Sequence, residues 1–334
     1  MKIAIVGAGA IGGFLGVRLA LTGQAVTFIA RGANLAAIRA GGMKLVSEAG
    51  VEEHATGVAA FERPEDAGPH DVVLLTVKAH QVAAVAAELR HLCHDDTAIV
   101  TMQNGIPWWY FHKHGGEHDG RPVRAADPDG TIARHIDPAR VIGSVVYPAA
   151  NLVAPGVVQH VEGNRFSLGE LDGSTTPRAQ AVAAALAGAG FKAPIIRDVR
   201  SEIWLKLWGN LSFNPISALS HATLVELCQF PPTRELSARM MAEAEVIAGK
   251  LGVAMRISIE RRIAGAEKVG AHKTSMLVDV EQGRPIELDA LMGAVIELGE
   301  LTQTPTPHIG AVYACASLLA RTLAVSGGKL RVTP

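Results

Sequence analysis

The feature that most constrains the fold is a glycine-rich turn near the start of the chain. Lys2–Val6 reads KIAIV, a short apolar run that is typical of a buried parallel strand. The next six residues follow the pattern G-x-G-x-x-G: Gly7, Ala8, Gly9, Ala10, Ile11 and Gly12. Residues 11–21 then have helical spacing, and residues 25–30 (AVTFIA) have the composition of a second strand. Together these segments predict a β-α-β unit.

In this context the glycine pattern indicates a dinucleotide site, whereas alone it would be weak evidence. Gly7 would permit the tight turn, Gly9 would let the backbone approach a pyrophosphate, and Gly12 would let the helix pack on the strand. The N-terminus of the helix would offer free N–H groups to the phosphates. The alternative is a plain strand-turn-helix that binds no ligand.

The end of the second strand distinguishes the two nicotinamide dinucleotides. NAD sites usually carry Asp or Glu there to bind the ribose 2′-hydroxyl. This chain has Phe28, Ile29, Ala30 and Arg31 instead. A guanidinium can bind a 2′-phosphate through two hydrogen bonds, so Arg31 favours NADP. The alternative is that Arg31 is a solvated loop residue.

The remaining pattern predicts two domains. Up to about residue 197, strand-like runs (71–77, 97–102, 141–148, 157–168 and 193–196) alternate with helical ones (79–92 and 180–189). Beyond it the runs are helical: 201–214, 234–251, 258–269, 287–301 and 307–325. We therefore predict an α/β chain, with an N-terminal Rossmann-type doubly wound sheet (residues 1–197) and a C-terminal all-helical domain (residues 198–334).

Composition excludes several classes of protein. Hydrophobic residues make up 49% and charged residues 19% of the chain, with a formal net charge of -1, which favours neither disorder nor a nucleic-acid-binding face. No apolar run of about 18 residues lacks polar interruption, so no membrane span is expected. The chain has three cysteines, Cys93, Cys228 and Cys315, which are too few and too far apart for a disulfide framework or a zinc site. We therefore expect a protein of the reducing cytoplasm.

A polar row marks the predicted helix 201–214. Lys206, Asn210 and Asn214 are spaced i, i+4, i+8, which places them on one stripe of a helix among apolar residues. Pro215 follows, so we expect the helix to bend or end there. Buried amides and ammonium groups need partners. The row is therefore either a structural hydrogen-bond row or part of a site.

Over essentially its full length the chain resembles the ketopantoate reductase family. The segments that carry the resemblance are GAGAIG at 7–12, Arg31, VKAHQ at 77–81, QNG at 103–105, the Lys206/Asn210/Asn214-Pro215 row, Ser275-Met276 with Asp279, and GRPIE at 283–287. The order and spacing of these segments are far more specific than the glycine pattern alone.

The resemblance implies that a hydride passes from NADPH to the ketone of a 2-oxoacid. It implies that Lys206 is the general acid and that Glu287 is a catalytic glutamate that positions the substrate. It further implies that Asn210, Asn214 and Ser275 bind the substrate. Asn104 would lie near both nicotinamide and substrate, with Lys78 and Gln81 on the cofactor side. The chemistry that the resemblance implies needs no metal, and the resemblance is compatible with a homodimer.

Some residues depart from the family or distract from the site. Some members carry a further substrate-binding asparagine where this chain has Leu224, which predicts a reshaped pocket. The segment Trp108–Arg124 opens with four aromatic residues (WWYF), which form either a lid or interface element or simple packing. His112, His114 and His118 lie too loosely for a metal site, and we expect a solvated loop. The run 260–262 (ERR) has the pattern of a solvated helix face.

Three functions follow. The first is reduction of ketopantoate to pantoate, a step of pantothenate biosynthesis, with a small-molecule substrate and no nucleic-acid or membrane partner. The second is the same chemistry on another, bulkier 2-oxoacid, which Leu224 and the aromatic segment favour. The third is a non-catalytic NADPH-binding sensor. A sensor would have no need for Lys206, Asn210, Ser275 and Glu287 together.

Overall fold

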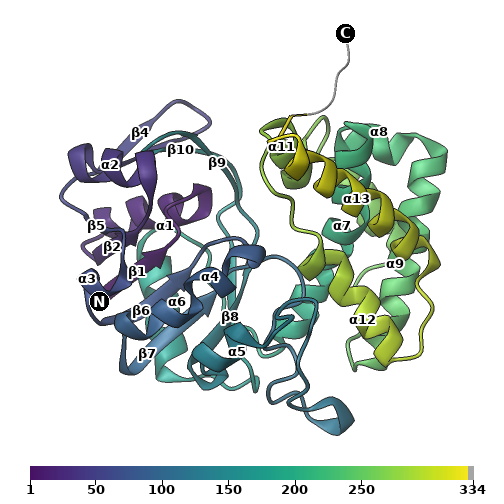
Figure 1. Cartoon of the computed structure of the whole chain (residues 1–334), viewed down its shortest axis with the longest axis horizontal. Coiled ribbons are helices and arrows are strands. Elements are labelled where there is room, and N and C mark those ends of the chain that lie inside the picture. Colours follow the sequence, from purple (N-terminus) through teal and green to yellow (C-terminus); the bar gives the residue numbers. More distant parts are fainter. Residues whose placement is uncertain (330–334) are drawn as a thin grey trace. The chain divides into compact units, whose positions relative to one another are not determined.

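A computed structural model describes Met1–Lys329 of the chain. The described residues form two compact units, each of which is treated by itself below (Figure 1). Unit 1 consists of Met1–Asn104, Trp108–Pro122 and Asp129–Val199, and unit 2 of Gly105–Pro107, Val123–Pro128 and the chain from Arg200 onward. Unit 1 contains both β-sheets, whereas the regular structure of unit 2 is helical.

Unit 1 is built on a seven-stranded sheet. Its strands, in spatial order, are β11 (Phe166–Glu170), β8 (Val141–Val146), β7 (Cys93–Thr101), β6 (His70–Leu75), β1 (Lys2–Val6), β2 (Ala25–Ile29) and β5 (Ala59–Phe61). All neighbours pair in parallel except β11, which runs antiparallel to β8. Val6 pairs with both Ile29 and Leu75, so three strands end at the same level. The predicted doubly wound α/β fold is confirmed.

A second sheet of four strands was not predicted. It has the order β4 (Glu52–Ala55), β3 (Met43–Val46), β10 (Val157–Glu162) and β9 (Ala149–Ala154). The prediction of one strand over residues 157–168 was wrong, because Gly163 adopts a φ of +75° and separates β10 from β11. The small sheet packs on the first helix, where His160 stacks on Phe14 with ring centroids 4.4 Å apart.

The helices of unit 1 vary in length. They are α1 (Ala10–Leu21), α2 (Gly32–Gly41), α3 (Pro64–Ala67), α4 (Ala83–Ala86), α5 (Thr131–His135) and α6 (Pro177–Gly188), with 3₁₀ turns η1 (Ala79–Gln81), η2 (Ala87–Leu92), η3 (Gly116–His118) and η4 (Pro138–Arg140). The predicted helix over residues 79–92 is therefore a broken one, in which one α-helical turn lies between two 3₁₀ turns.

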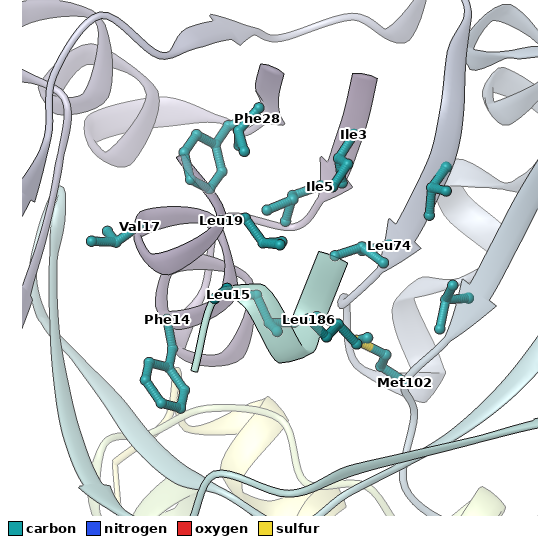
Figure 2. Packing of buried hydrophobic residues seen from close by; sticks show 14 of the residues in the cluster. Ile3, Ile5, Phe14, Leu15, Val17, Leu19, Phe28, Leu74, Met102 and Leu186 are labelled. Carbon is teal, nitrogen blue, oxygen red and sulfur yellow. The ribbon is translucent and has the colours of Figure 1, made fainter. Parts of the chain in front are cut away.

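The core of unit 1 lies where α1 meets the large sheet. Figure 2 shows apolar side chains of α1 meeting those of the strands, among them Phe14, Leu15, Leu19, Ile5 and Phe28. Close packing needs a small residue on the helix, because a Cβ at Gly16 would lie 2.2 Å from Cζ of Phe28. This packing fixes the angle at which α1 leaves the glycine turn, and so fixes the turn itself.

Unit 2 is built around α7 (Val199–Ser220). The other helices are α8 (Leu224–Gln229), α9 (Pro231–Lys250), α10 (Ile259–Glu267), α11 (Ser275–Glu281), α12 (Ala294–Leu301) and α13 (Pro307–Val325), with a π-helical turn η5 (Asp289–Gly293) before α12. The sequence predicts that this central helix bends or ends at Pro215. It does not end there, since α7 continues for five more residues to Ser220. Residues 211–218 are all buried, and this burial outweighs the hydrogen bond that Pro215 cannot donate.

Two further details of unit 2 differ from the predictions. The predicted helix 287–301 begins only at Asp289, and its first turn is π-helical, so Glu287 lies in the preceding segment without regular structure. α13 has 19 residues and is long and apolar enough to cross a membrane. Because core helices of water-soluble proteins can meet the same criterion, this alone is weak evidence for a membrane span.

Candidate functional site

The glycine turn lies at the carboxyl end of β1 in unit 1. Gly7 has a φ of +105°, and a Cβ there would lie 2.9 Å from the backbone nitrogen of Val77. At Gly12 a Cβ would lie 2.1 Å from the carbonyl oxygen of Gly7. The hydroxyl of Thr76 donates to that same oxygen at 2.7 Å. Residues larger than glycine therefore do not fit at positions 7 and 12, as the sequence pattern predicts.

Gly9 is different, because its surroundings are open. A Cβ built on Gly9 meets no atom within 4 Å. Gly9 precedes the first turn of α1, and no side chain caps that turn. The N–H groups of this turn can therefore bind an anion such as a pyrophosphate. The turn fits a dinucleotide.

Asn34 ties the glycine turn to the small sheet and was missed by the sequence argument. Its Nδ2 donates to the carbonyl oxygen of Ala8 at 2.5 Å, and its Oδ1 accepts from the backbone nitrogen of Gly156 at 2.7 Å. Arg31, three residues earlier, is exposed and occupies the N-cap position of α2 just beyond β2, without a capping hydrogen bond from its side chain. Asn34 joins segments far apart in the chain, so local sequence could not reveal it.

The other predicted cofactor-side residues follow β6 and β7. Lys78 and Gln81 form one turn, in which the side-chain oxygen of Gln81 accepts from the backbone nitrogen of Lys78 at 3.1 Å. Gln103 donates to the carbonyl oxygens of Leu75 and Val77, at 2.7 and 2.9 Å, and so links the ends of the two strands. Asn104 comes next and is partly buried.

In unit 2 the predicted polar row lies on α7. Asn214 is buried, whereas Lys206 and Asn210 are partly buried. The opposite side of the helix is fixed by Trp204 and Trp208, both fully buried, and the indole of Trp208 donates to the carbonyl oxygen of Met241 in α9 at 2.7 Å. The polar row is thus held on a rigid, tryptophan-anchored helix.

Lys206, the one ionisable residue of this row, has a strongly shifted pKa. Burial lowers the pKa of Lys206 from 10.5 to about 8, and the carboxylate of Glu287 opposes part of this shift. Since Glu287 acts on Lys206 electrostatically, the structure brings these two predicted residues together within unit 2. An ammonium group with a pKa near neutrality can hold a proton and also release it.

Ser275 begins a short helix in the same unit, and Glu287 lies beyond its end. Ser275 is the first residue of α11 and is exposed, and the hydroxyl of the preceding Thr274 caps the helix by accepting from the backbone nitrogen of Leu277 at 3.2 Å. Glu287 lies six residues beyond the end of α11 and is partly buried.

The aromatic segment belongs to the interior of unit 1. Trp108, Trp109, Tyr110 and Phe111 are all buried, and the indole of Trp109 donates to the hydroxyl of Thr101 at 3.0 Å. The packing interpretation of this segment therefore holds for all four rings. These rings leave no exposed aromatic surface that could serve as a lid.

The histidines of the same segment do not gather with other potential metal ligands. Within Met1–Lys329, the group whose ligand atoms lie within 4.8 Å of one another is Glu65, Glu88 and His91, which does not include them.

Arg262 is not part of a fully solvated face, contrary to the sequence prediction. Its guanidinium lies over the ring of Phe213 at 5.8 Å from the centroid, and a Cβ on Gly209 would meet its Nη2. The glycine in the middle of α7 therefore makes room for this guanidinium. Glu260 and Arg261 are exposed, as predicted.

Comparison with known proteins identifies the family. The model for ketopantoate reductase PanE/ApbA matches residues 3–115, and the model for its C-terminal part matches residues 198–320. A 2-dehydropantoate 2-reductase of Mesorhizobium japonicum is 51% identical over 329 residues, which cover 98% of this chain and 99% of that protein. The chain belongs to the ketopantoate reductase family. Another 2-dehydropantoate 2-reductase, from Archaeoglobus fulgidus, is 29% identical over 90% of this chain and 91% of its own.

Solved structures agree with this family. A candidate ketopantoate reductase from Ralstonia solanacearum MolK2 matches with a TM-score of 0.92 and 38% identity. The match covers 97% of the present chain and 98% of the Ralstonia chain. A D-mandelate dehydrogenase in complex with NADH and anilino(oxo)acetate has a TM-score of 0.82 at 22% identity, over 97% and 100% of the two chains. At this identity the dehydrogenase shows a shared fold alone.

Proposed function

We propose that this chain reduces 2-dehydropantoate (ketopantoate) to pantoate with NADPH, in the cytoplasm, as a step of pantothenate biosynthesis. The observation that carries the proposal is Lys206 on α7, whose pKa burial lowers to about 8 while Glu287 of the same unit opposes the shift. Residues 1–197 would bind the cofactor, and residues 198–334 would bind the substrate. The partner is a small molecule, and neither nucleic acid nor membrane takes part. A homodimer is compatible with the family.

Lys206 would act as the general acid. At neutral pH its ammonium group is protonated, so it can donate a hydrogen bond to the ketone oxygen and then the proton that this oxygen needs as it becomes an alkoxide. The pKa near 8 makes the transfer easier than from an ordinary lysine. NADPH, when bound, supplies the hydride. No metal is required for this chemistry.

The other polar residues would orient the substrate. Glu287 can accept a hydrogen bond from a substrate hydroxyl while it steadies the charge on Lys206. Asn210 and Asn214 present amides along the same helix as Lys206, and Ser275 presents a hydroxyl at the N-terminus of α11, where a carboxylate is stabilised. Asn104 would contact both nicotinamide and substrate.

The cofactor would be bound by unit 1. The open space at Gly9 and the uncapped N-terminus of α1 support a pyrophosphate site formed by residues 7–12. Arg31 is exposed just beyond β2, where its guanidinium can bind a 2′-phosphate, and this supports NADPH over NADH. Lys78, in the turn that Gln81 closes, would lie on the cofactor side as a second cation.

A second candidate is the reduction of a bulkier 2-oxoacid. Leu224 supports it, because this apolar residue begins α8, at a position where the family resemblance implies a substrate-binding asparagine in some members. An apolar wall favours an apolar side chain on the substrate.

The test is a steady-state assay with NADPH and ketopantoate, with NADH and bulkier 2-oxoacids in parallel. We expect turnover with ketopantoate, and in Arg31→Asp a KM for NADPH raised at least about tenfold, since a charge-assisted hydrogen bond is lost. Arg63→Ala removes an exposed arginine of the same unit and serves as the control. Turnover confined to a bulkier 2-oxoacid would favour the second candidate. Tight NADPH binding without any turnover would refute both and favour a sensor.

A further inference from the structure

The segment that carries Glu287 has no regular structure of its own. α11 ends at Glu281, a turn follows at residues 282–283, and residues 284–288 are neither helix nor strand. A glutamate on such a segment would be mobile unless other contacts held the backbone. The position of Glu287 therefore depends on what fixes the residues before it.

One set of contacts comes from Asp279, in the last turns of α11. The carbonyl oxygen of Asp279 accepts from the backbone nitrogen of Arg284 at 2.8 Å. Its Oδ1 accepts from Nε of the same arginine at 2.9 Å. The side chain of Asp279 is 5% exposed, whereas that of Arg284 is 42% exposed. Two hydrogen bonds thus close a loop of a few residues just before Glu287.

A second contact holds the same turn from outside. Gly283 has a φ of +65°, and a Cβ there would lie 2.6 Å from the carbonyl oxygen of Gly328, just beyond α13. The contact is reciprocal, because a Cβ on Gly328 would lie 2.5 Å from the carbonyl oxygen of Gly283. Ile286 and Leu288, on either side of Glu287, are buried. The backbone is therefore fixed both before and after Glu287.

We propose that Asp279 and Arg284 form a clamp of two positioning residues, which holds Glu287 close to Lys206. Neither residue of this clamp needs to touch the substrate. The proposal rests on the proposed function, in that it assigns a task within the same site. Asp279 also lies four residues after Ser275, on the same side of α11, so the clamp fixes Ser275 and Glu287 relative to each other.

Stability alone does not account for this pair. Replacing both partners of a buried ion pair by apolar residues is often neutral, whereas removing one partner alone costs about 3–5 kcal/mol because the other charge is left without its partner. A pair that apolar residues could replace without loss of stability, yet that closes the turn before Glu287, is better explained by the geometry it enforces.

The experiment compares Asp279→Asn, Arg284→Gln and the double variant with the wild-type enzyme. Arg239→Gln is the matched control, since it breaks an exposed arginine–glutamate pair on α9 of the same unit. Each variant is first checked for cooperative thermal unfolding with a melting temperature above that of the assay, and for NADPH binding. We then expect kcat to fall by about ten- to a hundredfold in each single variant, because misplacement of a catalytic group by about 1 Å costs this much. The double variant should be no worse than the single ones.

A second measurement needs neither substrate nor turnover. In protein carrying ¹³C-labelled lysine, the Cε resonance of Lys206, assigned through Lys206→Arg, should titrate with a midpoint near pH 8. Glu287 raises the pKa of Lys206, so the midpoint should move to lower pH in the clamp variants as Glu287 withdraws. The shift should be about one unit if the charges separate from about 4 to about 6 Å at an effective dielectric of about 20.

The outcomes separate the clamp from the proposed function. An unchanged midpoint together with unchanged kcat in folded clamp variants would overturn the clamp. Additive losses in the double variant would also overturn it, because they would mean two independent roles. If the midpoint moves but the wild-type enzyme reduces no 2-oxoacid, the clamp stands and the proposed function fails.

Discussion

Replacing Lys206 by methionine should abolish activity and yet stabilise the protein. One pKa unit corresponds to about 1.4 kcal/mol, so lowering the pKa of Lys206 from 10.5 to about 8 costs the folded state about 3 kcal/mol at neutral pH. Methionine has similar length and no charge, and therefore removes this cost. The pKa of about 8 already includes the attraction to Glu287, so the loss of this attraction needs no separate correction. The net gain of about 3 kcal/mol should raise Tm by about 6–12 °C.

The gain should also depend on pH in a defined direction. Because the folded-state pKa of Lys206 lies below the unfolded one, the unfolded chain binds more protons between about pH 8 and pH 10.5. The wild-type protein therefore recovers stability as the pH rises through this window, and the advantage of Lys206→Met should shrink.

Calorimetry of both proteins at pH 7 and pH 10 measures this change, with Lys268→Met as a control at an exposed lysine. The reasoning fails if Lys206→Met melts no higher than wild type at pH 7. It also fails if the difference is the same at both pH values.

Three other predictions concern activity. The kcat/KM for reduction should be constant below about pH 8 and fall about tenfold per unit above it, since Lys206 must be protonated; a profile flat to pH 10 would exclude Lys206 as the acid. Gly9→Ala should melt within about 2 °C of wild type yet bind NADPH at least about tenfold more weakly, whereas Gly12→Ala should fail to fold, as circular dichroism and NADPH titration would show. Leu224→Asn should shift the kcat/KM ratio toward ketopantoate by about tenfold over bulkier 2-oxoacids, and an unchanged ratio would mean that Leu224 does not line the pocket.

The nucleotide-binding half could be predicted because its signal is local. The strand Lys2–Val6, the glycine turn and the helix after it follow one another directly, and each has the residue type that its backbone requires. The steric reasons for Gly7 and Gly12 are the ones expected from the pattern. When the local conformational preferences of the residues agree with their tertiary packing, such a unit can be predicted from its sequence.

The small sheet and the irregular parts of unit 2 could not be predicted in this way. β3 and β10 pair although more than a hundred residues separate them in the chain. A short stretch of sequence does not indicate which distant strand it will pair with. α7 passes through Pro215 because its surroundings are buried, a tertiary effect that overrides the local preference. The π-helical turn after Glu287 depends equally on packing.

The candidate site shows the same division. Lys206, Asn210 and Asn214 follow from helical spacing, and the resemblance supplied Glu287 and Ser275. The sequence argument missed Thr76 and Asn34 and gave Gln103 no role of its own, because each binds a backbone carbonyl contributed by a distant segment of the chain. Polar residues of this kind look like ordinary turn residues in a sequence.

The contact between Gly283 and Gly328 has a consequence for the order of events during synthesis. A ribosome releases the N-terminal strands and the glycine turn first, and domains generally fold in that order. Glu287, however, follows a turn in which Gly283 packs against Gly328, just beyond α13. A nascent chain can therefore form its glycine turn long before Gly328 is available to pack against the turn that precedes Glu287.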